Sequence, residues 1–181
     1  MHRLLFTGRV TPIKGLSNVV AAFPSAGDWR LRIVGPDQDG HTAELKALAE
    51  KVGAAERIDF AGPKYGEALV QEYRRAACFI LPSFSENFGS VVVEALAAGI
   101  PVIASRGTPW AELVERKCGW WVENDPETLA RTIREMMALS DAERAAMGAR
   151  GRALVEEKYQ WPAIGRRMLA AYENLLGGNV V

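Results

Sequence analysis

Two acidic and two basic side chains stand out in this chain of 181 residues. Glu86 and Glu94 are separated by seven residues, and Arg9 and Lys14 lie on either side of a turn at Pro12. A carboxylate accepts hydrogen bonds from two neighbouring hydroxyls, which suits the diol of a ribose or of a sugar ring. An arginine that forks onto two oxygens, together with the mobile charge of a lysine, suits a diphosphate. These pairs are therefore candidate contacts for a diol and for a diphosphate.

Each pair also has a plainer explanation. In an isolated helix Glu94 is more often a solvated residue, and the Arg9/Lys14 loop is as often a solvated turn. Lys14 is followed by Gly15 and not by Ser or Thr, so the loop is no Walker A motif, and the chain contains no GxGxxG dinucleotide fingerprint. Either pair alone is modest support for a binding site.

The two glutamates fall in one short stretch, residues 81–103, with the sequence LPSFSENFGSVVVEALAAGIPVI. The apolar run at residues 77–81 predicts a buried strand, which the polar and proline-containing segment from Pro82 breaks. The chain therefore leaves the sheet at about Ser83. Glu86 is expected in the loop that follows.

A helix is expected directly after this loop. Gly89 and Ser90 begin it, residues 91–98 form two turns with Glu94 on the helix, and Gly99 ends it. The loop and the first turn leave backbone N–H groups without intrahelical partners at the positive end of the helix dipole. Such a place holds a phosphate or a sugar hydroxyl.

Strand and helix patterns alternate through the whole chain. Continuous apolar runs predict strands at residues 3–7, 31–34, 58–61, 77–81, 102–104 and 119–122. Apolar residues at three-four spacing predict buried helix faces, formed by Leu16, Val19, Val20 and Phe23; Leu45, Leu48, Ala49 and Val52; Leu69, Val70 and Tyr73; Leu129, Ile133, Met136 and Met137; and Ile164, Met168, Tyr172 and Leu175. Three helix starts are predicted at Thr108 before Pro109, Asp125 before Pro126, and Ser140 with Glu143.

This alternation predicts one α/β domain over residues 1–181, with a Rossmann-like, doubly wound parallel sheet. Helices are expected to cover both faces of the sheet, because most of the strands are apolar throughout. Domains of this class bind ligands in the crevice at the carboxyl ends of their strands. The loops that open at Gly8, Gly35, Gly62, Ser83 and Ser105 are therefore the places to find a site.

Composition and charge exclude several classes of function. Lys plus Arg and Asp plus Glu number 22 each, so no global charge recruits nucleic acid or anionic lipid. No apolar run is long enough to insert into a membrane, and the start lacks a signal-peptide pattern. Cys78 and Cys118 lack metal-type spacing, which predicts reduced thiols in a cytoplasmic protein.

Three further residues need an interpretation. Asp37 and Asp39 form a D-x-D pair that a metal site for a sugar nucleotide would use, but a polar loop after a strand is the commoner explanation and no metal site is expected. His41 stands alone at a helix start and is expected at the surface.

Three segments carry a resemblance to a known family. They are FTGRVTPIKGL at residues 6–16, PSFSENFGSVVVEALAAGIPVIAS at residues 82–105 and GWWVENDPETLA at residues 119–130. Together they resemble the C-terminal half of group 1, or family 4, retaining glycosyltransferases of the GT-B fold, and the match covers nearly the whole chain. Its most specific part is the E-x7-E signature, matched by Glu86 and Glu94 in the expected order after the Gly-Arg…Lys loop.

The resemblance implies a domain that binds the donor, a UDP-, GDP- or ADP-linked sugar. By this likeness Arg9 and Lys14 hold the diphosphate and Glu94 holds the ribose hydroxyls. Glu86 and the backbone at residues 87–89 hold the transferred sugar. The implied donor contacts are Gly8, Arg9, Lys14, Gly62, Pro63, Lys64, Glu86, Asn87, Phe88, Gly89, Ser90, Val91 and Glu94.

Within this set the likeness gives further roles. The backbone N–H groups of Ser90 and Val91 face the phosphates, and the loop at residues 62–64 borders the base. Arg9, Lys14 and Glu86 are the implied catalytic residues. Such enzymes resemble one another in working without a metal or another cofactor, because Arg and Lys neutralise the leaving nucleoside diphosphate. The acceptor attacks on the face that the phosphate leaves, so no protein nucleophile is assigned.

The resemblance also implies what acts together with this domain. The family's N-terminal domain carries the acceptor site, for a glycan or glycolipid, and is expected to be absent from this chain, so that the isolated domain is inactive. A cytoplasmic location is expected, either free or peripheral at the inner face of the membrane.

Two departures from the family pattern and two other functions stay open at this point. Asn87 stands where many relatives carry Gly, and residues 107–110 (GTPW) replace a more usual pair of glycines. Asn tolerates left-handed backbone, which would keep the shape of the loop. The alternative functions are a GT-B-like sugar-nucleotide epimerase and a non-catalytic module that senses a nucleotide or pairs with another subunit.

Overall fold

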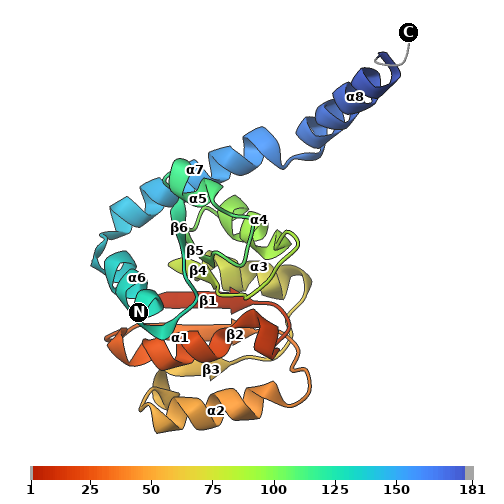
Figure 1. Cartoon of the computed structure of the whole chain (residues 1–181). Helices are drawn as coiled ribbons and strands as arrows, with labels where there is room; N and C mark the ends of the chain where they lie inside the picture. The colour runs from red at the N-terminus through yellow and green to blue at the C-terminus, as the bar shows by residue number, and fades with distance from the viewer. Residues whose placement is uncertain (1, 178–181) are drawn as a thin grey trace.

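The computed structural model describes residues 2–177 and contains one six-stranded sheet with helices on both faces (Figure 1). All strand pairs are parallel and follow the order β3-β2-β1-β4-β5-β6. The strands are β1 (Arg3–Thr7), β2 (Arg30–Val34), β3 (Ile58–Phe60), β4 (Cys78–Leu81), β5 (Val102–Ser105) and β6 (Gly119–Val122). The predicted Rossmann-like parallel sheet is therefore confirmed.

The order of strands reverses direction at β1. From β1 the chain moves through β2 to β3 at one edge, and then crosses to β4, β5 and β6 on the other side. β1 and β4 pair in parallel, with Leu4 opposite Cys78 and Leu5 opposite Phe79. The loops that leave these two strands therefore start side by side, and this reversal is where open α/β sheets hold their ligands.

Helices cover the sheet in the layers that right-handed crossovers produce. The helix α1 packs against α2 and α6, and α7 packs along α4 (Figure 1). The helices are α1 (Leu16–Ala22), α2 (His41–Lys51), α3 (Gly66–Arg74), α4 (Ser90–Ala97), α5 (Glu112–Glu115), α6 (Pro126–Ala138), α7 (Asp141–Lys158) and α8 (Trp161–Gly177), with short 3-10 turns η1 (Pro12–Lys14), η2 (Phe23–Ser25) and η3 (Ala55–Arg57).

The apolar strands lie in the middle of the core, as their composition predicts. Every residue of β4 and β5 is buried, as are Leu4, Leu5 and Phe6 of β1. Trp110 is also buried and packs in the core. A sheet that is covered on both faces needs strands that are apolar on both faces, which is why these segments do not alternate with polar residues.

Two of the three predicted helix starts are confirmed. Asp125 accepts a hydrogen bond of 2.8 Å from the backbone N–H of Thr128 at the start of α6. Ser140 and Glu143 form a reciprocal capping box at the start of α7.

The third predicted start, at Thr108 and Pro109, is wrong. The helix α5 begins at Glu112, and the hydroxyl of Thr108 instead donates a 2.7 Å hydrogen bond to the carbonyl oxygen of Ser105. That bond closes a turn at the end of β5, which uses the side chain that a helix cap would need.

Two side chains are placed differently from the prediction. Val70, predicted on the buried face of its helix, is 40% exposed. The buried residues of α3 are Glu72 and Tyr73, and Val70 instead lines a cavity on the surface of α3. His41 was expected at the surface but is buried, and its Nδ1 lies 2.7 Å from Glu44 Oε2 one turn further along α2.

The helix α8 extends away from the body of the molecule (Figure 1). Three residues of its predicted apolar face, Met168, Tyr172 and Leu175, are each more than half exposed, as is the neighbouring Leu169. Large apolar side chains gathered along one exposed helix are typical of a surface that another protein element covers.

The contact of α4 with α7 predicts the effect of one methyl group. A Cβ atom at Gly148 of α7 would lie 1.8 Å from the carbonyl oxygen of Gly99, at the end of α4. We expect Gly148→Ala to lower the free energy of unfolding in urea by about 1–3 kcal/mol, because the two helices must move apart.

The matched control is Gly165→Ala on α8, where an added Cβ has no neighbour within 4 Å among the described residues. Alanine there should leave stability unchanged or raise it by about 0.5–1 kcal/mol. Equal stability of the two variants would contradict the close contact of α4 with α7.

Candidate functional site

The loops that follow β1 and β4 are tied together at the carboxyl end of the sheet. The loop after β1 contains η1 and ends at Gly15, whose φ of 65° is left-handed. A Cβ at Gly15 would lie 2.2 Å from the carbonyl oxygen of Pro82, so this close approach requires glycine. The backbone N–H of Phe84 also donates a 2.9 Å hydrogen bond to the carbonyl oxygen of Ile13.

This contact brings Lys14 and Glu86 together as an ion pair between the two loops. Both side chains are mostly buried, at 17% and 14% exposure. The hydroxyl of Ser83 donates a second hydrogen bond, of 2.8 Å, to the same oxygen of Glu86. The cation and the carboxylate therefore neutralise each other at the carboxyl end of the sheet.

A cavity of about 350 Å³ opens beside this ion pair. Thr7, Gly8, Lys14, Glu86, Asn87, Phe88, Gly89, Ser90 and Val91 line it. All of these except Thr7 belong to the predicted set of donor contacts. The structure therefore brings together, around one cavity, predicted contact residues that the sequence places in two separate segments.

The first turn of α4 forms one wall of this cavity. The helix begins at Ser90 after Gly89, which has a left-handed φ of 77°. The first N–H groups of a helix have no intrahelical acceptors, and they carry the positive end of its dipole. With Lys14 in the same cavity, the site combines a fixed partial charge with a mobile full charge, which suits a phosphate group.

The loop that leads into α4 owes its shape to other residues than Asn87. Among the described residues the positive φ values do not include Asn87, so the left-handed tolerance expected of it is not used, and Gly89 supplies that conformation. Trp110 Nε1 donates a 2.6 Å hydrogen bond to the carbonyl oxygen of Phe88, and the N–H of Glu86 donates one of 3.0 Å to that of Gly107. The GTPW segment at residues 107–110 therefore holds the loop in place through these two hydrogen bonds.

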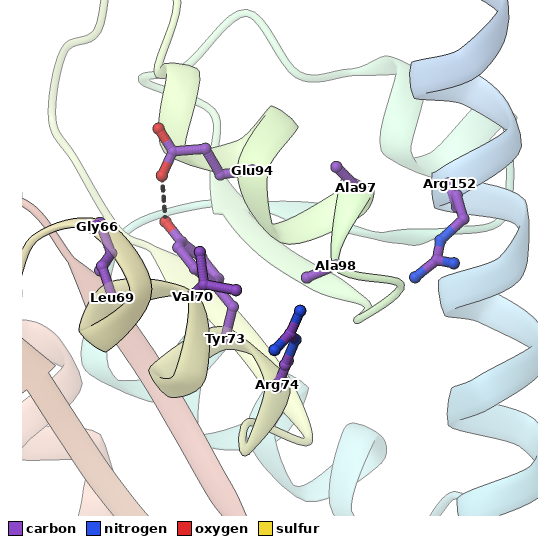
Figure 2. A pocket seen from close by; sticks show the side chains of 9 residues that line it. All are labelled: Gly66, Leu69, Val70, Tyr73, Arg74, Glu94, Ala97, Ala98 and Arg152. Atoms are coloured by element: carbon purple, nitrogen blue, oxygen red, sulfur yellow. Dashed lines mark hydrogen bonds between the residues drawn. The ribbon is translucent and has the colours of Figure 1, made fainter.

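Glu94 lies one turn further along α4, in a different cavity of about 560 Å³ between α3, α4 and α7 (Figure 2). The hydroxyl of Tyr73 on α3 donates a 2.8 Å hydrogen bond to Glu94 Oε2. Burial raises the pKa of Tyr73 well above its usual value, so this hydroxyl keeps its proton at all physiological pH values.

The remaining predicted contacts lie apart from the Lys14 cavity. Arg9 is exposed, its Nη1 lies 3.5 Å from Gln38 Oε1, and it is not among the residues that line the Lys14 cavity. Gly62 and Pro63 line a third cavity, of about 220 Å³, near Asp37, and Lys64 lies beside it on the same loop. The structure thus divides the predicted set among the cavity of Lys14, the cavity of Glu94 and the cavity beside Gly62, with Arg9 lining none of the three.

Asp37 has a structural role in this arrangement. Its carboxylate accepts a 2.9 Å hydrogen bond from the backbone N–H of Thr42, and that bond lowers the pKa of Asp37. Within residues 2–177, no cluster of three or more His, Cys, Asp or Glu side chains is placed to hold a metal ion.

Several supporting residues were missed from the sequence. Ser83 is three residues before Glu86 and Thr7 is next to Gly8, so proximity to the motifs was a usable signal for both. Asn124 donates to the carbonyl oxygen of Pro82, and Tyr73 donates to Glu94. These two lie far from their partners in sequence, and only the fold reveals them.

The described residues also bear on what the sequence predicts for membrane-spanning helices and for the two cysteines. The helices include none that is both long and apolar enough to cross a membrane. Cys78 and Cys118 are buried and form no disulfide among the described residues, and burial raises the pKa of Cys118 to about 11.

Comparisons with known proteins agree with this geometry. The model of the family "Glycosyl transferases group 1" matches residues 2–154. A D-inositol 3-phosphate glycosyltransferase of Corynebacterium glutamicum is 32% identical over 97% of this chain and 44% of its own length. The chain thus spans less than half the length of this relative.

Two solved structures are similar over almost the whole chain. Sucrose-phosphate synthase of Thermosynechococcus elongatus is 29% identical, with a TM-score of 0.86 over 98% of this chain and 46% of that one. Anabaena Alr3699/HepE, solved in complex with UDP, is 22% identical, with a TM-score of 0.84 over 95% of this chain and 48% of that one. The second likeness is one of fold.

Substitution of the two members of the Lys14–Glu86 pair should change the affinity for pyrophosphate in opposite directions. Glu86→Gln removes the carboxylate that neutralises Lys14, so we expect inorganic pyrophosphate to bind about threefold to tenfold more tightly. Lys14→Met should weaken pyrophosphate binding by about tenfold or more, because a charge-assisted hydrogen bond is lost. Isothermal titration calorimetry measures both.

Lys51→Met is the matched control, since Lys51 is exposed at the end of α2 and should leave pyrophosphate binding unchanged. If Glu86→Gln binds pyrophosphate more weakly than the unmodified protein does, Glu86 does not compete with the anion for Lys14.

Proposed function

Since the chain belongs to the group 1 glycosyltransferase family, we propose that it is the donor-binding domain of a retaining glycosyltransferase. In this proposal it binds a nucleotide-diphosphate sugar and, with an N-terminal domain, transfers the glycosyl group to a glycan or glycolipid acceptor. The observation that carries the proposal is the meeting of Lys14, Glu86 and the first turn of α4 in one cavity.

The diphosphate is assigned to the phosphate side of this cavity. Lys14 leaves Glu86 and pairs with a phosphate oxygen, and the backbone N–H groups of Ser90 and Val91 donate to the same group. Arg9 also pairs with the diphosphate, since its 3.5 Å contact with Gln38 is long and exposed and is easily exchanged for a phosphate. Each charge-assisted hydrogen bond contributes roughly 1.5–3 kcal/mol.

The sugar and the nucleoside lie on either side of the diphosphate. Glu86, once released from Lys14, accepts hydrogen bonds from the transferred sugar, together with the backbone of residues 87–89. Glu94 accepts from the ribose hydroxyls, and the loop at residues 62–64 borders the base. The UDP bound by the similarly folded Anabaena protein supports a nucleoside diphosphate as the ligand class. UDP-, GDP- and ADP-linked sugars all belong to this class.

Catalysis follows from where negative charge develops. As the bond from the sugar to phosphate breaks, charge grows on the leaving nucleoside diphosphate, and Lys14, Arg9 and the α4 dipole stabilise it more strongly than in the ground state. The acceptor hydroxyl attacks on the same face that the phosphate leaves and gives its proton to the departing phosphate oxygen, and attack on this face retains the configuration. No side chain of this domain serves as a nucleophile.

The acceptor side is assigned to a further domain. The chain spans less than half of its curated relative, and α8 carries five large apolar side chains that the described residues leave exposed: Trp161, Met168, Leu169, Tyr172 and Leu175. Ile13 and Phe84, which are joined by a backbone hydrogen bond between the loops of Lys14 and Glu86, are also about half exposed. A domain that covers α8 and closes over these two loops would bury these surfaces and exclude water from the reaction.

Calorimetry of this chain against UDP, GDP and ADP tests the proposal. We expect at least one of them to bind, and we expect Arg9→Ala and Glu94→Ala each to weaken it by about tenfold, because each loses a charge-assisted hydrogen bond. Absence of binding to all three, or unchanged binding in both variants, would refute the proposed donor site.

Matched controls are Arg134→Ala and Glu135→Ala, which remove the same charges from the exposed face of α6. A repeat in EDTA should leave donor binding intact, because the cations of the chain supply the charge. Strict dependence on Mg²⁺ would instead favour a metal at Asp37 and Asp39.

A further inference from the structure

Three oxygen-bearing side chains from different elements form a continuous hydrogen-bonded series behind Glu94. Thr7 Oγ1 at the end of β1 lies 2.7 Å from the hydroxyl of Tyr73 on α3. The same hydroxyl lies 2.8 Å from Glu94 Oε2 on α4. The series therefore runs from the strand at the centre of the sheet to the carboxylate assigned to the ribose.

The direction of these hydrogen bonds is fixed by proton count. Tyr73 has one hydroxyl proton and donates it to Glu94, so Thr7 must donate its own proton to Tyr73. Thr7 and Tyr73 are each only 4% exposed, and the ring of Tyr73 packs against Phe79 with centroids 5.8 Å apart. The series is thus held by the core.

Glu94 is different, because it is exposed at the edge of the cavity between α3 and α4 (Figure 2). Its Oε2 is anchored by Tyr73, and Oε1 takes part in no side-chain hydrogen bond among the described residues. An exposed glutamate ordinarily samples many rotamers, and a ligand that binds it must restrict them. Anchoring one oxygen removes much of that cost before the ligand arrives.

We propose that Tyr73 is a positioning residue, which with Thr7 holds Glu94 as a preformed acceptor for the ribose diol and makes the domain selective for ribonucleotide donors. This inference rests on the proposed donor site, since it deepens the role of Glu94 there. Tyr73 does not touch the donor, and its effect passes entirely through the carboxylate.

A purely structural role makes a different prediction. If the Tyr73–Glu94 hydrogen bond serves only to join α3 to α4, its loss weakens every nucleotide to the same extent. If it orients Glu94 for the diol, its loss matters only when the ligand carries the diol. A ligand without ribose hydroxyls therefore separates the two roles.

The experiment measures Kd by calorimetry for whichever of UDP, GDP and ADP the unmodified chain binds most tightly, and for its 2′,3′-dideoxy form. Tyr73→Phe removes one hydroxyl and keeps the packed ring. We expect it to weaken the ribonucleotide by about tenfold and the dideoxy nucleotide by less than about twofold, as loss of one hydrogen bond to a charged group implies.

Thr7→Val provides a second variant in case Tyr73→Phe folds poorly. It keeps the shape of the side chain and removes only the hydroxyl that orients Tyr73, so we expect a smaller loss of about twofold to fivefold, again confined to the ribonucleotide. Tyr172→Phe, on the exposed part of α8, is the matched control and should change neither Kd.

The outcomes separate this inference from the function on which it rests. Equal weakening of both ligands, or no change in either, by the folded variants would overturn the role of Tyr73 while the donor site stands. Absence of nucleotide binding to the unmodified chain would overturn the donor site, and this inference with it.

Discussion

The parallel pairing of β1 with β4 is the constraint on which the rest of the structure depends. The chain reverses direction across the sheet at this pair, so no crossover helix lies over the carboxyl ends of the two strands. Two loops that are about 70 residues apart in sequence can meet there, and Lys14 reaches Glu86 as a result. Gly15 maintains this approach, because the carbonyl oxygen of Pro82 leaves no room for a side chain.

The electrostatics of the site follow from that meeting. Lys14 and Glu86 compensate each other, so neither charge is left mostly buried and unpaired. A ligand that offers both an anion and hydroxyls can separate the pair and satisfy each member. A bare anion satisfies only Lys14, and a neutral sugar satisfies only Glu86. The pairing thus favours a ligand that combines the two, as a sugar diphosphate does.

The strands and most of the helix starts could be predicted from the sequence, because they depend on residues that are close together in the chain. Apolar runs placed all six strands, and Asp125 and Ser140 marked helix starts, because such caps depend on neighbours a few residues away. Thr108 failed as a cap because its hydroxyl closes a turn instead, and Val70 and His41 were misplaced because their burial depends on distant elements. The direction of Arg9 and the Tyr73–Glu94 contact are long-range, so no local pattern reveals them.

In the proposed function the first turn of α4 and the loop of Lys14 hold the diphosphate of a nucleotide donor. Backbone amide chemical shifts, followed by NMR during titration with UDP, report on these segments residue by residue. We expect the largest changes at Ser90 and Val91, with accompanying changes at residues 8–14. Changes confined to residues 37–42 or to α8, with Ser90 and Val91 unaffected, would contradict it.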